Sequence, residues 1–289
     1  MEAERGLTAI RSYIDKMPSL PTTVSKILEI CNDPQTRPAD LNKVISLDPV
    51  LMGKVMKLIN SAYYGVSQEV TSLVRAIIML GINTVKNLAL STAVLGTLGK
   101  AKDFKALNME GFWRHSLCVG VTSKLIAKRR RVDNSILEEY FMAGLLHDLG
   151  KIPLNNVLSD GYLRAMSTSD RRNVSLYKAE REEIGADHCD VGRFIMENWK
   201  LSKEITDAVA FHHTAAGYEG SSRDIVDTVA VANYFANVSE IGFAGDRYPE
   251  KPEQAVFTHL GIKLEDLEDV TDTVNNEIEK ARVFLRVSA

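Results

Sequence analysis

The 289-residue sequence predicts an all-α protein. Apolar residues recur at helical spacing, as they do at Leu41, Val44 and Ile45. The alternation of apolar and polar residues that marks strands is scarce, and the turn dipeptide Asp160-Gly161 has no such alternation beside it. Helix caps and stop signals, by contrast, punctuate much of the chain. These three observations together favour helices from one end of the chain to the other.

Caps and prolines define the helices of the first hundred residues. Asp48 followed by Pro49 predicts an N-cap and a proline at the first helical position. Ser72 predicts the cap of the next helix, which carries Ile78 and which Gly81 ends. This part of the chain is therefore expected to hold short, compact helices.

Changes in composition divide the chain into four parts. Residues 1–16 are expected to form an N-terminal helix, 17–104 a small helical lobe, 105–240 a second helical lobe and 241–289 a C-terminal helical extension. The polar stretch from Gly99 to Asp103 is the expected joint between the lobes.

Two loops and one long helix are expected in the last third of the chain. The segment from Tyr218 to Asp224 is the clearest flexible loop, and Gly242 to Pro252 is a second loop before the C-terminal helices. The acidic segment from Glu265 to Asp272 is interpreted as the exposed face and first turn of the last helix. The apolar residues of that helix form one long stripe, made of Leu264, Leu267, Val274, Ile278 and Leu285.

Charge and composition exclude several classes of protein. The formal net charge is −3, which gives no field to attract DNA or an anionic membrane. The longest charge-free stretch, Asn87 to Gly99, is shorter than the ~20 residues that a spanning helix needs. The charged start of the chain lacks the apolar core of a signal peptide. Cys31, Cys118 and Cys189 are too widely spaced for a zinc knuckle or a disulfide framework. We therefore expect a cytoplasmic protein with no membrane span and no nucleic-acid partner.

The dense basic run from Lys128 to Arg131 is interpreted as a solvated helix C-terminus, where the helix dipole favours cations. A contact with an anion or a nucleic acid is the alternative, although no aromatic residues interleave with the run.

The histidines carry the clearest functional signal. His147-Asp148 follows the apolar stretch from Tyr140 to Leu146, so the pair is expected near the end of a buried helix. A buried carboxylate must be paired or must coordinate a cation. Imidazole nitrogen and carboxylate oxygen are both good ligands for divalent ions such as Zn, Fe or Mn.

Other histidines also lie beside apolar faces or at helix ends. His115 lies near the start of an amphipathic helix, His188 at the start of another, and His212-His213 at the end of a third. Taken singly, each histidine is better explained as a surface residue, or as a core residue with satisfied hydrogen bonds, than as a metal ligand. Their concentration in the middle of the chain is what favours a shared metal site. His259 has no comparable partner and is expected to be structural.

Such a cluster permits metal-assisted hydrolysis. A divalent ion lowers the pKa of a bound water toward neutrality and neutralises a phosphoryl oxygen. Lys151 follows Asp148 closely and could meet a phosphate oxygen, although an exposed cation at a helix end is the favoured interpretation. If the protein is an enzyme, Asp148 and Lys151 are its candidate catalytic residues.

A long, ordered set of motifs lies between residues 17 and 217. It comprises Leu20-Pro21, Val24, Ile27, Asp40-Leu41, Ile45, Asp48-Pro49, Leu51, Asn60-Ser61-Ala62-Tyr63-Tyr64-Gly65, Ser72-Leu73, Ala76-Ile77, Leu80-Gly81 and Leu88-Ala89-Leu90. In these residues the chain resembles the HDOD domain (HD-related output domain) of bacterial signalling proteins. The resemblance implies a small N-terminal helical lobe packed on a bundle related to HD-domain metal phosphohydrolases. It also implies a regulatory role, usually with the metal ligands lost.

This chain keeps more histidines than that degenerate pattern. The order of its histidines and of the motif His147-Asp148-Leu149-Gly150-Lys151 resembles that of the HD-GYP cyclic-di-GMP phosphodiesterases. The resemblance implies metal ligands at His115, His147, Asp148, His188, His212, His213 and Asn233.

The chain departs from the HD-GYP pattern in three places. Asn233 stands where the family has an aspartate, and Gly111 stands where it has another acidic ligand. The loop after His213 has a Gly-Tyr but lacks the family's acidic residue and proline. With Asp148 as the one firm carboxylate, a second ion is expected to bind less well, unless a neighbouring acid such as Asp187 or Asp190 substitutes for Asn233.

We therefore expect a bacterial-type HDOD signalling protein with one or two divalent ions (Fe, Mn, Zn or Ni) in its HD-like lobe. It would act through signalling proteins as partners, with little or no catalysis. The competing hypothesis is a metal-dependent phosphohydrolase for a cyclic dinucleotide or nucleotide, and a phosphate-containing small ligand fits both. A metal-free helical scaffold is the third. Tyr63 and Tyr64 are expected to pack the two lobes together, with a partner surface as the alternative.

Overall fold

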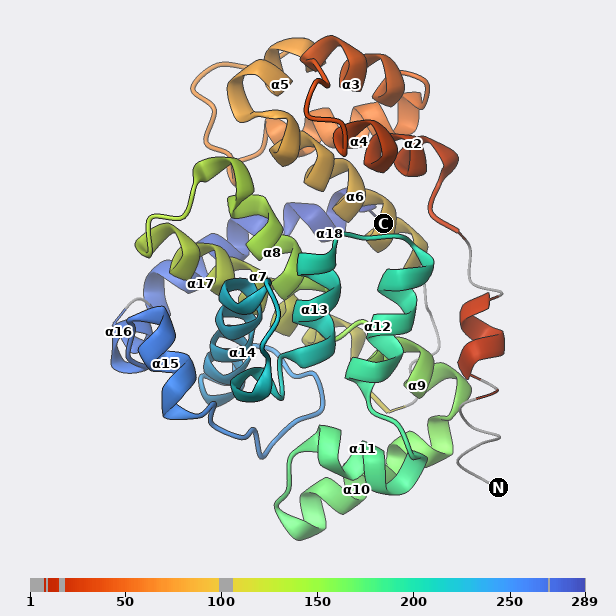
Figure 1. Cartoon of the computed structure of the whole chain (residues 1–289), viewed down its shortest axis with the longest axis vertical. Helices are drawn as coiled ribbons and strands as arrows, with labels where there is room; N and C mark the ends of the chain where they lie inside the picture. Colours follow the sequence, from red (N-terminus) through yellow and green to blue (C-terminus); the bar gives the residue numbers. More distant parts are fainter. Residues whose placement is uncertain (1–7, 9, 16–18, 99–105, 270, 289) are drawn as a thin grey trace.

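The computed structural model describes residues 8, 10–15, 19–98, 106–269 and 271–288 (Figure 1). These residues form helices and no strand, which confirms the all-α prediction. The N-terminal lobe contains α2 (Thr22–Cys31), α3 (Pro38–Ile45), α4 (Pro49–Ile59), α5 (Leu73–Leu80) and α6 (Ile82–Leu98). The second lobe contains α7 (Met109–Arg129), η1 (Asn134–Ile136), α8 (Leu137–Leu146), α9 (Lys151–Val157), α10 (Ser159–Arg172), α11 (Leu176–Ile184), α12 (His188–Asn198), α13 (Lys203–Phe211), η2 (Ala215–Gly217) and α14 (Arg223–Val238). The C-terminal helices are α15 (Gln254–Leu260), α16 (Glu265–Glu268), α17 (Thr271–Ala281) and α18 (Val283–Ser288).

Local signals set the helix ends of the N-terminal lobe. The Asp48 side chain accepts a hydrogen bond of 2.9 Å from the backbone N–H of Leu51 and so caps α4. Ser72 caps α5 in the same way. Gly81 ends α5 with φ of 88°, a conformation that favours glycine. The caps and the stop predicted at these residues are confirmed.

Aromatic residues join the two lobes. The ring of Tyr63 lies 5.5 Å from that of Phe141 in α8 and 5.3 Å from that of Phe284 in α18. The ammonium group of Lys124 in α7 lies 4.6 Å from the centre of the Tyr63 ring. Tyr64 is packed edge-on against Tyr63. These tyrosines therefore pack the lobes together, as the sequence predicted.

Two glycines let the central helices of the second lobe approach closely. A Cβ atom on Gly144 in α8 would lie 2.7 Å from the Cα of Gly120 in α7. The α14 helix packs against both α7 and α8, and α13 packs against α8 (Figure 1). The end of α8 is thereby surrounded by helices, and this is where His147-Asp148 lies.

The prediction of one long C-terminal helix is wrong. The apolar stripe that begins at Leu264 is divided among α16, α17 and α18. The α17 helix packs on α7, whereas α18 packs on α4 and α6 of the N-terminal lobe. One straight helix could not serve both surfaces. The apolar stripe indicates which residues are buried, but it does not show that the chain changes direction between α17 and α18.

The basic run from Lys128 to Arg131 lies at the C-terminal end of α7, as expected. Arg130 pairs with Asp224 at 3.3 Å. The Gly99 to Asp103 joint lies outside the described residues, and the division of the chain into four parts stays a prediction. No single helix of the described chain has the length and apolarity to cross a membrane. Only α5 and α6 taken together pass that test, and they meet at a bend of 116°.

Candidate metal centre

A tight turn after α8 carries the central carboxylate. His147 to Gly150 connect α8 to α9, and both His147 and Asp148 are completely buried. The turn lies against the start of α12, since a Cβ atom on Gly150 would lie 1.9 Å from the backbone oxygen of His188. Only glycine allows this approach, which brings His188 next to Asp148.

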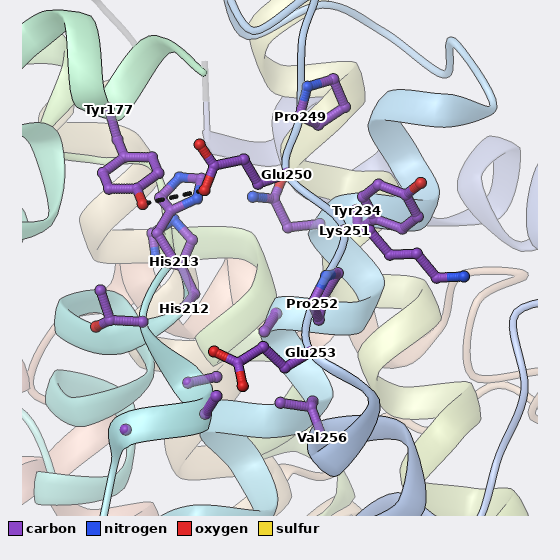
Figure 2. Close-up of a pocket in the computed structure, with 16 residues that line it drawn as sticks. Tyr177, His212, His213, Tyr234, Pro249, Glu250, Lys251, Pro252, Glu253 and Val256 are labelled. Atoms are coloured by element: carbon purple, nitrogen blue, oxygen red, sulfur yellow. Dashed lines mark hydrogen bonds between the residues drawn. The ribbon is translucent and has the colours of Figure 1, made fainter. Parts of the chain in front are cut away.

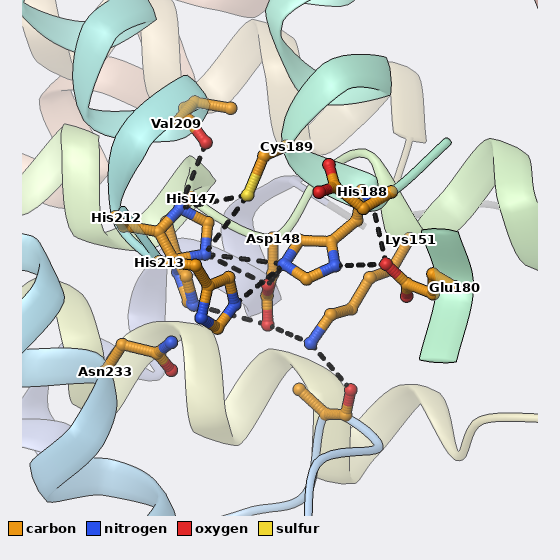
Figure 3. Close-up of polar contacts among 12 residues, drawn as sticks. His147, Asp148, Lys151, Glu180, His188, Cys189, Val209, His212, His213 and Asn233 are labelled. Atoms are coloured by element: carbon orange, nitrogen blue, oxygen red, sulfur yellow. Dashed lines mark hydrogen bonds and ion pairs between the residues drawn. The ribbon is translucent and has the colours of Figure 1, made fainter. Parts of the chain in front are cut away.

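The structure brings the other six predicted ligand residues together around Asp148, and Figure 3 labels all of them except His115. The Nε2 atom of His147 lies 3.2 Å from Asp148 Oδ2, and that of His188 lies 3.2 Å from Oδ1. The corresponding distances to the carboxylate are 3.7 Å for His115 and 3.9 Å for His212. His213 reaches the group through its Nε2 atom, which lies 3.2 Å from that of His188. Five helices or their ends supply these side chains, namely α7, α8, α12, α13 and α14.

Hydrogen bonds at the far side of three rings fix their orientation. The Nδ1 atom of His147 donates to the backbone oxygen of Gly144 at 2.7 Å, and that of His212 donates to the oxygen of Val209 at 3.0 Å. The Nδ1 atom of His188 donates to a carboxylate, as described below. In His147 and His212 the proton on Nδ1 leaves Nε2 as the atom that can bind a cation, and in His188 a bound cation would take the place of the Nε2 proton.

The inward nitrogen atoms crowd one another. The Nε2 atom of His188 lies 3.4 Å from that of His212 and 3.2 Å from that of His213. Lone pairs that face one another at such distances repel unless a proton or a metal ion lies between them. In the described structure His147 Nε2 and Asp148 Oδ1 are also buried without a hydrogen-bond partner. The donor set therefore fits a divalent cation.

Asn233 does point into the site. Its Oδ1 atom accepts hydrogen bonds from His115 Nε2 at 3.0 Å and from Asn237 Nδ2 at 2.9 Å. The sequence left open that Asp187 or Asp190 takes the ligand position instead of Asn233, and the structure does not support this. The carboxylates of those two residues pair with Arg181 at 2.7 and 3.2 Å.

Asp148 is held ionised by its neighbours. Burial raises its pKa, but His147 and Lys151 lower it, and the result lies well below the usual range. Lys151 donates to Asp148 Oδ2 at 2.8 Å and to the backbone oxygen of Ala244 at 2.9 Å. Burial lowers the pKa of Lys151 and Asp148 raises it, for a net increase. The favoured expectation of an exposed Lys151 is wrong, because this ion pair holds the side chain at 3% exposure.

Burial keeps several of the rings neutral. It lowers the pKa of His115 to about 3, and it holds the pKa values of His212 and His213 well below their usual range. His188 differs, because its carboxylate partner outweighs burial and holds its pKa well above the usual range. Neutral imidazole is the form that binds metal ions.

Glu180 in α11 is a further residue of the site that was not predicted from the sequence. Its Oε2 atom accepts from His188 Nδ1 at 2.6 Å and from the backbone N–H of His188 at 2.9 Å. A carboxylate behind a metal-binding histidine fixes the ring and increases its basicity. The signal was present in the helical period, because Glu180 lies on the same apolar stripe as Leu176 and Ile184.

Cys189 was also missed as a site residue. Its Sγ atom lies 3.8 Å from His212 Nδ1 and 3.9 Å from His212 Nε2. Burial raises the pKa of this thiol to about 11. Its place in the sequence, directly after His188 in the first turn of α12, was the available signal.

His259 has partners that the sequence did not reveal. Its Nδ1 atom lies 2.7 Å from Asp227 Oδ2, and its Nε2 atom lies 3.1 Å from Asp224 Oδ1. These contacts join α15 to α14 and are consistent with the expected structural role.

A cavity of about 310 Å³ lies beside the cluster (Figure 2). His212, His213 and Asn233 form part of its wall. Tyr177 stacks on His213 with ring centres 4.4 Å apart, and its hydroxyl donates to Glu250 at 3.4 Å. Glu250 and other residues of the loop before α15 line the opposite side. A small ligand in this cavity could therefore reach the histidine cluster.

A family model for the HDOD domain matches residues 17–215. The chain belongs to the HDOD family. An HDOD domain protein of unknown function from Geobacter sulfurreducens is 27% identical, and the alignment covers 97% of each chain with a TM-score of 0.74. A protein of Shewanella amazonensis, provisionally named a phosphohydrolase, is 21% identical with a TM-score of 0.71 over 97% of this chain and 98% of that one, and shows the shared fold alone.

An uncharacterized protein of Treponema pallidum (strain Nichols) is 23% identical over 78% of this chain. The HDOD chain spans 43% of the length of that relative. The expected HDOD fold is thus confirmed, and the described residues contain histidine-rich clusters that could hold a metal ion.

Proposed function

We propose that this HDOD protein is a cytoplasmic regulatory protein that binds a divalent metal ion in its second lobe and acts through protein partners. The observation that carries the metal site is the convergence of inward Nε2 atoms on Asp148, with the Nδ1 protons of His147, His188 and His212 committed elsewhere. His115, His147, Asp148, His188, His212, His213 and Asn233 would hold the metal. When bound, the ion would supply positive charge for an anionic ligand.

The charges of the site argue against efficient hydrolysis. Asp148 is the one carboxylate among the proposed ligands, and it already pairs with Lys151 at 2.8 Å. Asn233 offers a neutral oxygen that His115 and Asn237 use. Too little negative charge is present to hold two dications close together.

Elemental analysis of the tag-free protein, purified without added metal or chelator, tests the metal site. About one Fe, Mn, Zn or Ni per chain supports the proposal. An Asp148→Ala variant should lose that metal. A wild-type chain that stays empty after soaking with each ion contradicts the metal site and leaves a helical scaffold.

A second candidate function is a metal-dependent phosphohydrolase. The cavity beside His212 and His213 favours it, because a phosphate in the cavity could reach the cluster. Turnover of a simple phosphodiester such as bis(p-nitrophenyl) phosphate, or of a cyclic dinucleotide, would support this function if Asp148→Ala abolishes it. No turnover by a metal-loaded chain would support the regulatory proposal.

Exposed apolar side chains of the N-terminal lobe support action through partners. Val50 and Ile78 are 68% and 69% exposed, although most large apolar residues of the described chain are buried. If Ile78 binds a signalling protein, Ile78→Asp should abolish the interaction. Leu163→Asp, at a residue 45% exposed in α10, should leave it intact. Equal binding by both variants would place the interface elsewhere.

A further inference from the structure

We propose that Cys189 supplies a thiolate ligand to a metal ion held by His188, His212 and His213. The inference rests on the metal site proposed above and identifies the chemical class of ion that prefers it. Each of the four residues offers one ligand atom, and these atoms all lie within 4.8 Å of one another. The thiol is buried, and its sulfur points toward His212 (Figure 3).

The distances fit a tetrahedral zinc site. Zn–N bonds of 2.0–2.1 Å at tetrahedral angles separate two nitrogen ligands by about 3.3 Å. His188 Nε2 lies 3.2 Å from His213 Nε2 and 3.4 Å from His212 Nε2. A Zn–S bond of about 2.3 Å places sulfur about 3.6 Å from each nitrogen. The 3.9 Å between Cys189 Sγ and His212 Nε2 is close to this value, and the other ligand atoms all lie within 4.8 Å of the sulfur.

The thiolate also supplies charge that the site lacks. Asn233 is neutral, and Lys151 already offsets part of the charge of Asp148. Coordination breaks the S–H bond of Cys189, forms a sulfur–metal bond and releases one proton to solvent, so the site gains one negative charge. Two charges then lie near the dication, one on the Cys189 ligand and one on Asp148, whose Oδ1 atom lies 3.2 Å from His188 Nε2.

A sulfur ligand predicts which ions bind best. Thiolate is a soft donor that suits Zn and Fe, whereas Mn and Mg prefer oxygen. The expected order of affinity is therefore zinc well above manganese. Replacement of the thiol by a hydroxyl should reduce zinc affinity by at least about 10-fold, because even indirect support of a ligand is worth that much. Manganese affinity should not change.

X-ray absorption of the full chain loaded with zinc tests the inference directly. The wild-type protein should show a sulfur neighbour at about 2.3 Å from zinc. The Cys189→Ser variant should lose it. Cys118→Ser is the matched control, because Cys118 is also buried but lies in α7 beside Thr122, at 3.9 Å, and should keep the sulfur neighbour.

Each other outcome overturns something definite. Zinc bound to nitrogen and oxygen alone in the wild type, or a sulfur neighbour that persists in Cys189→Ser, refutes the role of Cys189 and leaves the proposed metal site standing. A wild-type chain that retains no zinc or other metal refutes the metal site and the thiolate ligand together. The absence of a sulfur neighbour in the wild type refutes the role of Cys189 even if the variant fails to fold.

Discussion

At the scale of single residues, Glu180 is expected to control metal affinity without touching the metal. It accepts two hydrogen bonds from His188 and so fixes the ring whose Nε2 atom faces Asp148. Glu180→Gln keeps the shape but removes the charge. Loss of such outer partners weakens metal binding by about 10- to 100-fold, and we expect a change in that range in zinc titrations monitored by calorimetry.

Glu182 offers a matched control on the same helix. Its side chain is about half exposed and pairs with Arg172, which is not a residue of the histidine cluster. Glu182→Gln should leave zinc affinity unchanged, because exposed ion pairs contribute little. If both variants weaken zinc binding equally, the effect comes from the charge of α11 as a whole and not from the bond to His188.

Asp207 gives a prediction about stability and pH. It binds Lys203, Tyr218 and Ser222, and so ties the loop after His213 to α13. Burial raises the pKa of Asp207, but these partners lower it below its usual 3.8. The stabilisation is therefore complete above pH 3.8 and is lost as the pH falls through the lower folded value.

Asp207→Asn should accordingly lower the free energy of unfolding at pH 7 by about 1.5–3 kcal/mol, the typical contribution of hydrogen bonds to a charged group. The difference from wild type should shrink as the pH falls below 3.8. Urea denaturation at pH 7 and pH 3 measures both values. A difference that stays constant with pH would show that the charge of Asp207 is not what holds the loop.

Residues differ in how far the sequence alone reveals them. Asp48, Ser72 and the cap of α12 at Asp187 act on backbone atoms within three positions, so their roles can be predicted locally. The burial of Lys151 cannot, because the backbone oxygen of Ala244 that binds it lies 93 positions away. The positions of the ligand histidines beside apolar stretches and at helix ends indicated a shared site, and the HD-GYP resemblance added Asn233, but their hydrogen-bond partners could not be predicted.

At the scale of elements, the crossing of α7 and α8 positions His115 relative to Asp148. Gly144→Ala would push a methyl group to 2.7 Å from the Cα of Gly120, so the helices would have to separate. We expect a loss of stability of about 1–3 kcal/mol, typical of overpacking, together with weaker metal binding. Thermal unfolding and zinc titration of the variant measure the two effects.

Gly53 is the matched control for this substitution. It lies on an exposed face of α4, and a Cβ atom there would have no neighbour within 4 Å. Gly53→Ala should stabilise the protein by about 0.5–1 kcal/mol, because alanine is the better helix former. Similar losses in both variants would mean that helix propensity, and not the approach to α7, decides the result.

Elements were predicted well where the apolar stripe lies on one unbroken helix. The helical period located α4 and α5 because each buries its apolar residues within a single helix. It failed at the C-terminus, where α17 and α18 bury neighbouring parts of one stripe against different lobes. Periodicity reports that a residue is buried, but the surface that buries it is set by the tertiary structure.

At the scale of the whole molecule, the candidate site connects helices that are distant in the sequence. His115 comes from α7 and Asn233 from α14, 118 positions apart, and they meet at 3.0 Å. A metal ion held by these side chains would bind the folded protein and not the unfolded chain. Ligand binding should therefore stabilise the second lobe as a unit.

Zinc at 100 times its dissociation constant should raise the free energy of unfolding by about 2.7 kcal/mol, and a chelator should reverse the effect. His212→Ala should abolish most of this gain, because it removes a nitrogen that lies 3.4 Å from His188 Nε2. His259→Ala should keep it, since His259 binds Asp227 and Asp224 outside the cluster. Differential scanning calorimetry with and without zinc measures all three proteins. An equal zinc effect in both variants would mean that the ion stabilises the fold from some other place than the Asp148 cluster.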